Sequence, residues 1–310
     1  MTDRVPRIAV VGSINMDLVV RTDRIPRIAE TVLGESITES CGGKGANQAV
    51  AAARLGAHVG LIGCLGSDPF GTRLRAGLES AGVDLSGVAI EPESTSGVAV
   101  VTVDATGANA ITVVAGANRL VTPALVERHR AIIEAADLLL VQLEVPLPAV
   151  LAAIQIARES RRPVIVDPAP ALINPPPQLL DVEVICPNEV EAATLLGLPT
   201  DRLDQPMQAA RELVKRGARH ALITLGDQGA IWCDASHRCH TVPAYPTVAV
   251  DSTAAGDALA GALAVALAER RPMPEAVDWA CAAGALAVSR PGAQAAMPTR
   301  SEVDRLASSR

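Results

Sequence analysis

Residues 250–270 read VDSTAAGDALAGALAVALAER, and the rest of the chain is interpreted around this stretch. A polar segment, residues 251–257, runs into alanines and leucines, which have strong intrinsic helix preferences. The sequence therefore predicts a loop that ends where a buried helix begins. Because residues 254–256 and 258 are Ala or Gly, a ligand can approach the free N–H groups of this helix start closely, and the helix dipole favours an anion there.

Asp257 places a carboxylate at this anion-binding helix start. If the site only held phosphate, the carboxylate would repel it. The same carboxylate is well placed to accept a proton from a nucleophile beside the phosphate. Aspartate is also among the preferred N-cap residues. The residues alone leave both interpretations open, a general base and a helix cap.

Two motifs resemble the signatures of the ribokinase-like (PfkB) carbohydrate kinases. Residues 251–258, DSTAAGDA, resemble the family's D-T-x-x-A-G-D signature, and residues 42–49, GGKGANQA, resemble its N-terminal G-G-K-G-A-N-Q-A signature. Both occur in the order and spacing of the family, and the resemblance extends from Gly12 to Gln294. It implies a three-layer α/β fold in which a mostly parallel central sheet is flanked by helices and carries a small β-sheet lid.

Length and composition limit the class of protein. The 310 residues are compatible with one catalytic domain, residues 1–310, that has an accessory element. A net charge of -7 argues against a nucleic-acid or anionic-membrane partner. The six cysteines lack C-x-x-C spacing, which favours reduced thiols, and we attribute the short spacing of Cys233 and Cys239 to chance. With no secretory pattern and no apolar run of about 18 residues, we expect a cytoplasmic protein.

The chain opens with a predicted strand followed by two polar residues. Residues 8–12, IAVVG, form a continuous apolar run that is typical of a strand buried on both faces. If the next residues are extended, Asn15 and Asp17 point to the same face and offer an amide beside a carboxylate, which suits a sugar. On the residues alone, an Asx turn at the strand exit is the commoner explanation. The resemblance favours sugar binding, because the family holds sugar hydroxyls at these positions.

Two insertions, at about 15–40 and 96–116, contain β-favouring segments with interleaved polar residues. These segments are residues 18–20, 31–33, 97–103 and 109–114. The last two are joined by residues 104–107, which have the composition of a hairpin turn. We expect a small β-sheet lid, and because its free edge needs covering, a homodimer formed through two lids.

The glycine-rich residues 42–45 lead into a helix that Gly56 ends. They are not a P-loop, because G-x-x-x-x-G-K-[S/T] is absent, and no G-x-G-x-x-G follows a strand. The resemblance instead assigns this segment to the sugar. The residues concerned are Gly42, Gly43, Lys44 and Asn47. For the lysine, a solvated loop side chain is the alternative.

From residue 59 onward, apolar runs alternate with helical segments, which predicts a mostly parallel sheet flanked by helices. Strands are predicted at 60–63, 138–141, 164–166, 184–186 and 221–225, and helices near 70–80, 122–135, 147–160, 189–196 and 206–217. Ligands of such sheets lie outside the carboxyl ends of the strands. Polar residues or glycine follow the strands at Glu144, Asp167, Asn188, Glu191 and Gly226. Each one alone could be a helix cap or turn residue.

The resemblance assigns further roles at these strand ends. Residues 188–191, NEVE, resemble the N-x-x-E motif, whose acidic member, Glu191, helps organise Mg²⁺ through water. Residues 224–229, TLGDQG, resemble the T-L-G-x-x-G nucleotide loop, whose glycines let ATP approach the backbone. Glu144 corresponds to a sugar-contacting position. The nucleotide-contacting positions are Asn188, Thr224, Leu225, Gly226, Asp227, Gly229, Gly256 and Cys281.

Taken together, the resemblance implies ATP-dependent phosphorylation of D-ribose at its 5-hydroxyl. Asp257 would draw the hydroxyl proton, while the N–H groups of Ala255, Gly256 and Asp257 and Mg²⁺ hold the charge of the transferring phosphoryl group. Two alternatives stay open: another kinase of the family, for fructose, deoxyribose or a nucleoside, and a sugar-binding regulator without turnover. A nucleoside needs stacking partners, and the chain has only four Phe, Trp and Tyr residues.

The resemblance also implies a potassium site beside the helix start. The matching positions are Asp251, Thr253, Ala287, Arg290, Gly292 and Ala296. Because most of these side chains cannot bind a cation, the ion would be held by carbonyl oxygens, with one negative charge from Asp251. Ala296 stands where the family often has a small hydroxyl residue, which removes one oxygen. The alternative is that Asp251 only anchors the loop by accepting backbone N–H bonds.

Overall fold

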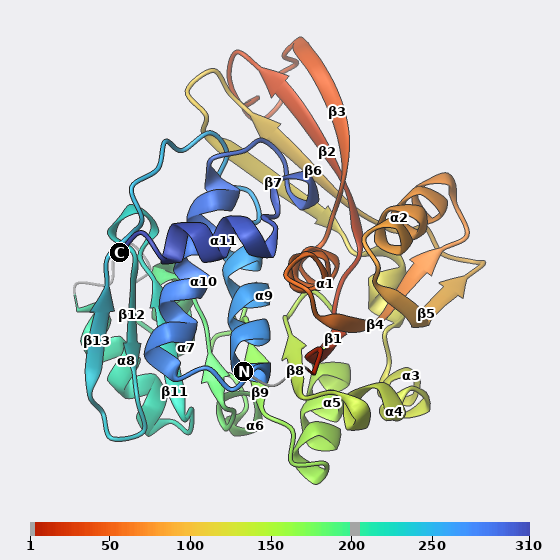
Figure 1. Ribbon diagram of the computed structural model, residues 1–310. Helices are drawn as coiled ribbons and strands as arrows, with labels where there is room; N and C mark the ends of the chain where they lie inside the picture. The colour runs from red at the N-terminus through yellow and green to blue at the C-terminus, as the bar shows by residue number, and fades with distance from the viewer. Residues whose placement is uncertain (1–3, 199–204) are drawn as a thin grey trace.

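The computed structural model describes residues 4–198 and 205–310. A nine-stranded sheet forms the middle layer, helices cover both of its faces, and a four-stranded sheet rises from one end of the molecule (Figure 1). The predicted three-layer α/β fold with a small separate sheet is confirmed. None of the helices in the described residues is long and apolar enough to span a membrane.

The large sheet is mostly parallel. Its strands are β1 (Arg7–Val11), β4 (His58–Gly66), β5 (Asp84–Glu91), β8 (Leu138–Val141), β9 (Val164–Val166), β10 (Val184–Ile185), β11 (His220–Thr224), β12 (Ala230–Cys233) and β13 (Cys239–Val242). They lie in the order β13-β12-β11-β10-β9-β8-β1-β4-β5, and only the pairs β11-β12 and β12-β13 are antiparallel. Strands β5, β12 and β13 were not predicted.

Helices form one layer on each face of this sheet. One layer consists of α1 (Lys44–Arg54), α2 (Pro69–Ser80), α9 (Ala255–Ala268), α10 (Met273–Val288) and α11 (Arg300–Ala307). The other consists of α3 (Pro123–Arg128), α4 (Arg130–Ala135), α5 (Leu147–Glu159), α6 (Pro177–Leu180), α7 (Glu189–Leu196) and α8 (Pro206–Lys215). Strand β1 shows why its sequence is continuously apolar: Ile8 and Val10 pack against the first layer, and Ala9 and Val11 against the second.

The predicted helix at 122–135 is wrong as a single element. The structure has two helices there, α3 and α4, which meet at His129. The backbone of His129 leaves the helical conformation, with φ -107° and ψ 20°, after its N–H has bonded the carbonyls of both Leu125 and Val126. This tightened last turn ends α3, and no glycine or proline marks it in the sequence.

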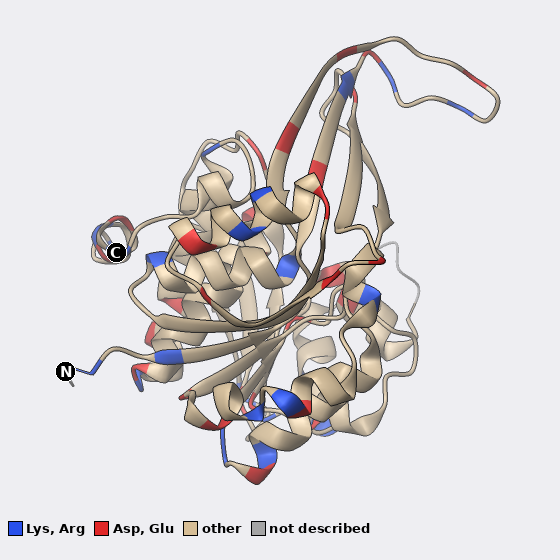
Figure 2. Ribbon diagram, turned by 90° about the vertical axis from the view of Figure 1, so that its right-hand side faces the viewer, with Lys and Arg blue, Asp and Glu red and all other residues tan. Residues whose placement is uncertain are grey.

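The small sheet has the strand order β3-β2-β6-β7. These strands are β2 (Asn15–Thr22), β3 (Gly34–Gly42), β6 (Gly97–Val103) and β7 (Asn109–Val114). The predicted hairpin is confirmed, because β6 and β7 pair antiparallel across the predicted turn. The strand predicted at 31–33 is wrong: β3 begins only at Gly34, and the segment before it extends away from the body of the protein (Figure 2). Leu33 is 89% exposed, so its β-favouring side chain has no surface to pack against.

Cys233 and Cys239 lie directly opposite each other in the β12-β13 pair and form a disulfide. The attribution of their spacing to chance is therefore wrong, because an antiparallel hairpin brings the two residues together. The remaining cysteines, Cys41, Cys64, Cys186 and Cys281, are free thiols.

Candidate active site

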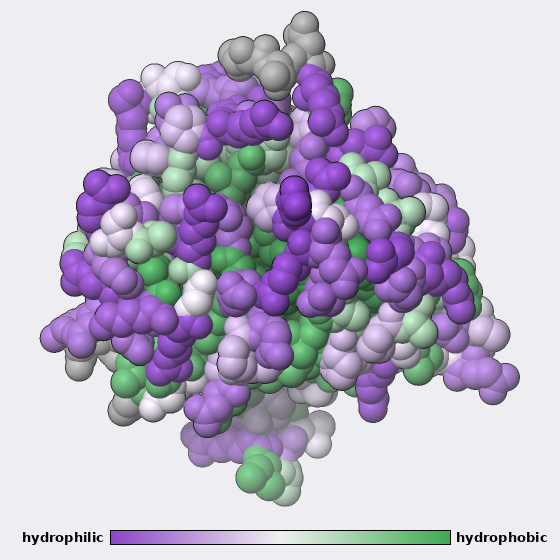
Figure 3. Space-filling model, turned by 90° about the horizontal axis from the view of Figure 1, so that it is seen from below, coloured by the Kyte–Doolittle hydropathy of each residue, from purple (hydrophilic) through white to green (hydrophobic). Residues whose placement is uncertain are grey.

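A pocket of about 250 Å³ opens at the carboxyl ends of β9, β10 and β11. Its lining residues are Lys44, Asp167, Cys186, Asn188, Glu191, Thr224, Ser252, Ala254, Gly256 and Asp257. The expectation that polar groups gather at these strand ends holds for Asp167, Asn188 and Glu191. A pocket of about 300 Å³ on the opposite side, the side that Figure 3 views, has one carboxylate, Asp84, in a mainly apolar lining. The pocket at the carboxyl ends of the strands is therefore the candidate active site.

Asp257 lies in the first turn of α9, and its side chain is 4% exposed. Its two carboxylate oxygens accept hydrogen bonds from side chains of α1, Oδ2 from Asn47 Nδ2 at 2.9 Å and Oδ1 from Gln48 Nε2 at 3.0 Å. The N-cap of α9 is Ala254, which adopts the left-handed conformation and gives no side-chain cap. The cap interpretation of Asp257 is therefore wrong, and its carboxylate faces the pocket.

The start of α9 presents two backbone donors. In the described residues, the N–H groups of Gly256 and Asp257 have no hydrogen-bond acceptor, whereas the N–H of Ala255 bonds the carbonyl of Ser252 at 3.3 Å. The predicted set of three donors is thus reduced to two. A Cβ at Gly256 would meet no protein atom within 4 Å, so the space beside this glycine belongs to the pocket.

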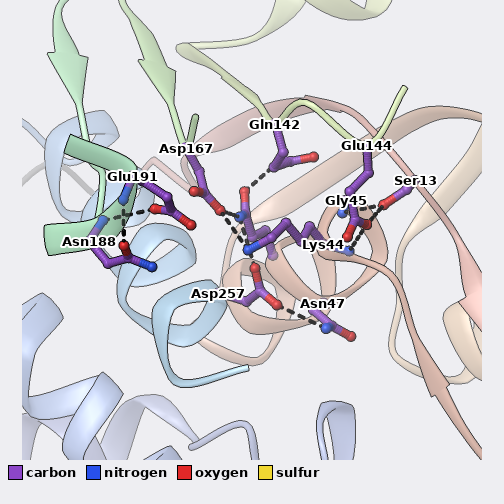
Figure 4. A network of polar contacts seen from close by, with 11 residues as sticks. Ser13, Lys44, Gly45, Asn47, Gln142, Glu144, Asp167, Asn188, Glu191 and Asp257 are labelled. Atoms are coloured by element: carbon purple, nitrogen blue, oxygen red, sulfur yellow. Dashed lines mark hydrogen bonds and ion pairs between the residues drawn. The ribbon is translucent and has the colours of Figure 1, made fainter. Parts of the chain in front are cut away.

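Lys44 is the ammonium group among several carboxylates, of which Asp167 and Asp257 are buried (Figure 4). Its Nζ lies 3.5 Å from Asp167 Oδ2. Burial alone would lower the pKa of Lys44, but four carboxylates outweigh it, so the pKa lies above its ordinary value and the side chain carries its charge. These carboxylates are Asp167, Asp257, Glu144 and Glu191. The alternative of a solvated loop lysine is wrong.

The predicted sugar-contacting residues lie beside this pocket. Glu144 Oε2 accepts the hydroxyl of Ser13 at 2.5 Å and the backbone N–H of Lys44 at 3.1 Å. Burial, together with the charges of Glu144 and Asp257, raises the pKa of Asp17 to about 7. Asp17 therefore lies within the electrostatic reach of Asp257, although β2 belongs to the small sheet.

Asn15 and the glycine pair, Gly42 and Gly43, lie in the same region as Asp17. Asn15 is 2% exposed and lies in extended strand β2, so it is not in an Asx turn, and its Oδ1 accepts a bond from Asn118 at 2.7 Å. A Cβ at Gly42 would overlap the carboxylate of Asp17, and one at Gly43 would lie 2.6 Å from the backbone nitrogen of Asn15. Gly43 also has a φ of 88°, which favours glycine.

Asn188 and Glu191 form a capping box at the start of α7. Asn188 Oδ1 accepts the N–H of Glu191 at 2.9 Å, and Glu191 Oε2 accepts the N–H of Asn188 at 2.8 Å. The second oxygen of Glu191 remains for a ligand, and carboxylate oxygens suit Mg²⁺. Across residues 4–198 and 205–310, no three His, Cys, Asp or Glu side chains are arranged to hold a metal by themselves. The donor set thus fits an ion held largely by phosphate and water.

The predicted nucleotide residues divide into two groups. Thr224 and Gly256 line the pocket, together with Asn188. The others lie outside its lining: Leu225 is buried, Gly226 and Asp227 are in a 3₁₀ turn, and Cys281 is on α10. Gly229 has a structural reason for being glycine, because its φ is 94° and a Cβ would overlap the carbonyl of Val242.

The predicted potassium positions are partly brought together. Asp251 Oδ1 accepts the N–H of Thr253 and Oδ2 that of Gly292, both at 2.9 Å. Burial raises the pKa of Asp251, but these hydrogen bonds lower it by more. The pKa of Asp251 therefore lies below its ordinary value. The hydrogen bonds that we expect if Asp251 anchors the loop are therefore present. The carbonyl of Ala287 accepts the N–H of Arg290, whose side chain pairs with Glu302, and Ala296 is buried.

Four buried polar residues of the site were not assigned a role from the sequence. They are Ser13, Gln48, Asn118 and Gln142. Gln48 stands inside the glycine-rich motif and follows Asn47, so the motif could have suggested it. Gln142 follows β8 directly, in the same kind of position as Asp167 after β9, and strand-end placement is the signal that could have found it.

The comparisons with known proteins agree with this geometry. The sequence matches the family described as pfkB family carbohydrate kinase over residues 5–300. A ribokinase from Schizosaccharomyces pombe is 39% identical over 306 residues, covering 96% of each chain, and a deoxyribokinase from Salmonella typhimurium is 36% identical over 298 residues, covering 94% of this chain and 95% of that one. The solved structure of Arabidopsis thaliana ribokinase complexed with ribose and ATP has a TM-score of 0.89 at 32% identity, covering 98% and 99% of the two chains. The chain therefore belongs to the pfkB family of carbohydrate kinases.

Proposed function

We propose that the protein transfers the γ-phosphoryl group of ATP to the 5-hydroxyl of D-ribose, giving D-ribose 5-phosphate and ADP. The observation that carries the proposal is the start of α9. There the buried carboxylate of Asp257 faces one pocket together with the N–H groups of Gly256 and Asp257, which have no acceptor among the described residues. The similarity to ribokinases, one of them complexed with ribose and ATP, supports the choice of substrates.

In the proposed mechanism, Asp257 accepts the proton of the attacking hydroxyl. Asn47 and Gln48 hold its carboxylate by one hydrogen bond to each oxygen, so its remaining lone pairs are available to the substrate. The N–H groups of Gly256 and Asp257 would bind oxygens of the transferring phosphoryl group, where charge spreads during the reaction. The ammonium of Lys44 offsets part of the negative charge that ATP adds to this acidic pocket.

Magnesium and potassium belong to the same proposal. Glu191, with Asn188 beside it, would hold Mg²⁺ through water, and the ion would supply positive charge to the phosphate oxygens. The loop that holds Asp251 next to Gly292 would carry K⁺ through its carbonyl oxygens. The remaining nucleotide positions would contact ATP outside the pocket; they are Leu225, Gly226, Asp227, Gly229 and Cys281.

A second candidate substrate is 2-deoxyribose. A deoxyribokinase is 36% identical to this chain, close to the 39% of the ribokinase from Schizosaccharomyces pombe. The two sugars differ by one hydroxyl, and a site built to bond that hydroxyl discriminates strongly against its absence. We propose that the side chains of Asp17 and Asn15 form hydrogen bonds with the sugar hydroxyls, including the one that differs.

The test is a panel of sugars in a coupled ADP-release assay. With ATP, Mg²⁺ and K⁺ present, we expect D-ribose to give the highest kcat/KM, above 2-deoxyribose and fructose. A higher kcat/KM for 2-deoxyribose than for D-ribose would make 2-deoxyribose the substrate in place of D-ribose. If no sugar stimulated ADP release while ribose still bound in calorimetry, the protein would be a sugar-binding regulator.

We further propose that the small sheet is a lid on a single catalytic domain, and that two lids pair in a homodimer. The outer strand β7 is exposed along its whole length, and the lid carries exposed apolar side chains. Ile37, Ile111 and Val113 are 63%, 59% and 49% exposed. Light scattering at micromolar protein should give twice the monomer mass, and a monomer mass would exclude this arrangement. Because the reaction needs ATP, we place the protein in the cytoplasm.

A further inference from the structure

We propose that Gln48 is a positioning residue that fixes the carboxylate of Asp257 for proton transfer. This inference rests on the proposed kinase function. Gln48 is fully buried on α1, and its Nε2 donates to two carboxylates at once, to Asp257 Oδ1 at 3.0 Å and to Asp167 Oδ2 at 2.7 Å. Both hydrogens of one amide group are thereby used to hold two acids on either side of it.

The oxygen of this amide bonds Gln142, which is also fully buried. Gln142 Nε2 donates to Gln48 Oε1, so the oxygen of the Gln48 amide is occupied and its nitrogen faces the acids. If the amide turned over, its oxygen would face the carboxylates and repel them. The two carboxylates and Gln142 therefore hold the Gln48 amide with its donor toward Asp257.

Asn47 and Gln48 differ in what remains for a ligand. Asn47 donates to Asp257 Oδ2 at 2.9 Å, and its own Oδ1 is buried and accepts no hydrogen bond from the described residues. Gln48 has its amide oxygen and nitrogen bonded to protein groups. Gln48 therefore acts through Asp257 and not by touching the sugar.

The hydrogen bonds from Gln48 to both acids also have an electrostatic consequence. Asp167 and Asp257 are both buried, and the charge of Asp257 disfavours the ionised form of Asp167. Burial, then the charge of Asp257, raises the pKa of Asp167, while Lys44 and the bond from Gln48 lower it. A hydrogen-bond donor to an ionised carboxylate favours the ionised form, so the bond from Gln48 offsets part of the effect of burial on Asp167.

A double-mutant cycle with Asp257→Asn tests the inference. We expect Gln48→Met, which keeps the length of the side chain, to lower kcat about 10-fold to 100-fold with the KM for ribose changed less than about 3-fold. In the Asp257→Asn background, the same change should lower kcat by less than about 3-fold, because there is no base left to position. An equal loss in both backgrounds, or a loss confined to KM, overturns the proposal.

Two further variants keep the test decisive. Gln142→Met leaves Gln48 in place but frees its amide, and it should give a smaller loss with the same non-additivity; additivity overturns the proposal even if Gln48→Met does not fold. Asn118→Leu is the matched control, because this buried amide bonds Ile14 and Asn15 but not Asp257, and its loss should be additive. If Asn118→Leu were as non-additive as Gln48→Met, the cycle would not single out Gln48 and the proposal would be overturned.

The position of the Asp257 carboxylate separates this inference from the proposed function. If the unmodified protein phosphorylated no sugar, the kinase proposal would fail. A crystal structure of Gln48→Met would then test the inference alone: a rotated Asp257 carboxylate supports it, and an unchanged one overturns it.

Discussion

Gly261 of α9 packs directly over Ala51 of α1. A Cβ at Gly261 would lie 2.7 Å from the Cβ of Ala51 and 3.0 Å from the carbonyl oxygen of Gln48. One turn earlier in each helix, Asp257 meets Asn47. The missing side chain at Gly261 therefore lets the two helices approach closely enough for side chains of α1 to hold the carboxylate.

We expect Gly261→Ala to destabilise the fold and to lower kcat. Alanine gains about 1 kcal/mol of helix propensity, but the overpacked interface costs about 1–3 kcal/mol, so the net effect is a loss of stability on the order of 1 kcal/mol. Urea unfolding measures it. Gly284→Ala in α10 is the control, because its Cβ would have its nearest neighbour at an ordinary 3.4 Å. Equal effects of the two changes would contradict the role of Gly261.

Asp257→Asn should lower kcat by about 10²–10⁴-fold, the usual contribution of a general base, with little change in ribose affinity. The amide keeps the size of the carboxylate but cannot accept the proton. Steady-state kinetics and ribose calorimetry separate the two quantities. Near-normal kcat in this variant would rule out Asp257 as the base.

Gly256→Ala separates function from folding. Because the new Cβ would meet no protein atom within 4 Å, we expect the free energy of unfolding to stay the same or rise by up to about 1 kcal/mol from helix propensity. The same methyl group would occupy the pocket beside the N–H donors, so kcat/KM for ATP should fall. Unchanged kinetics would show that the phosphoryl group does not approach Gly256.

The strands and strand-end groups of this site follow from local pattern. Apolar runs of the right length predicted six strands of the large sheet, and the residues after them supplied Asp167, Asn188 and Glu191. Such patterns report burial along one segment, and they do not report which side chains from distant segments meet. For this reason Gln142 and its partner Gln48 received no role, although Gln48 stands inside the glycine-rich motif and Gln142 directly follows a predicted strand.

The errors have two origins. Leu33 has a β-favouring side chain but is 89% exposed, and His129 ends α3 through local bonds that no glycine or proline announces. Cys233 and Cys239 pair because of a hairpin, β12-β13, that the sequence pattern did not predict. For the strand and the disulfide, tertiary contact or its absence decided against local propensity, and for His129 the bonds are local but have no signal in the sequence.

The raised pKa of Asp17 predicts how stability varies with pH. Its ordinary value is 3.8 and its value in the folded protein is about 7, so the folded state binds this proton more tightly than the unfolded state. The stabilising contribution is complete below about pH 4 and is lost as pH rises through about 7. In ligand-free protein, we therefore expect Asp17→Asn to have little effect on Tm below about pH 4 and to raise it at pH 8. A Tm difference that did not vary with pH would contradict the shift.

Activity should depend on potassium. In buffer free of sodium and potassium, turnover should be low and should rise on adding millimolar potassium, and Asp251→Ala should remove the response. Because Asp251 also accepts N–H bonds from Thr253 and Gly292, Asp251→Asn is the control, since it retains one acceptor oxygen for the loop. Activity that is indifferent to potassium would show that the site is absent here, where Ala296 supplies no hydroxyl.

The hydrogen bond from Asn47 to Asp257 joins residues 210 positions apart, and that from Gln48 joins residues 209 apart. Helix α9 is buried along most of its length and contacts both α1 and α10. During synthesis from the N-terminus, the first layer of helices thus lacks its central member until most of the chain has been made. Contacts of such sequence separation are formed slowly, so the catalytic carboxylate reaches its partners among the last events of folding, and a chain interrupted before α9 has neither a complete core nor a base.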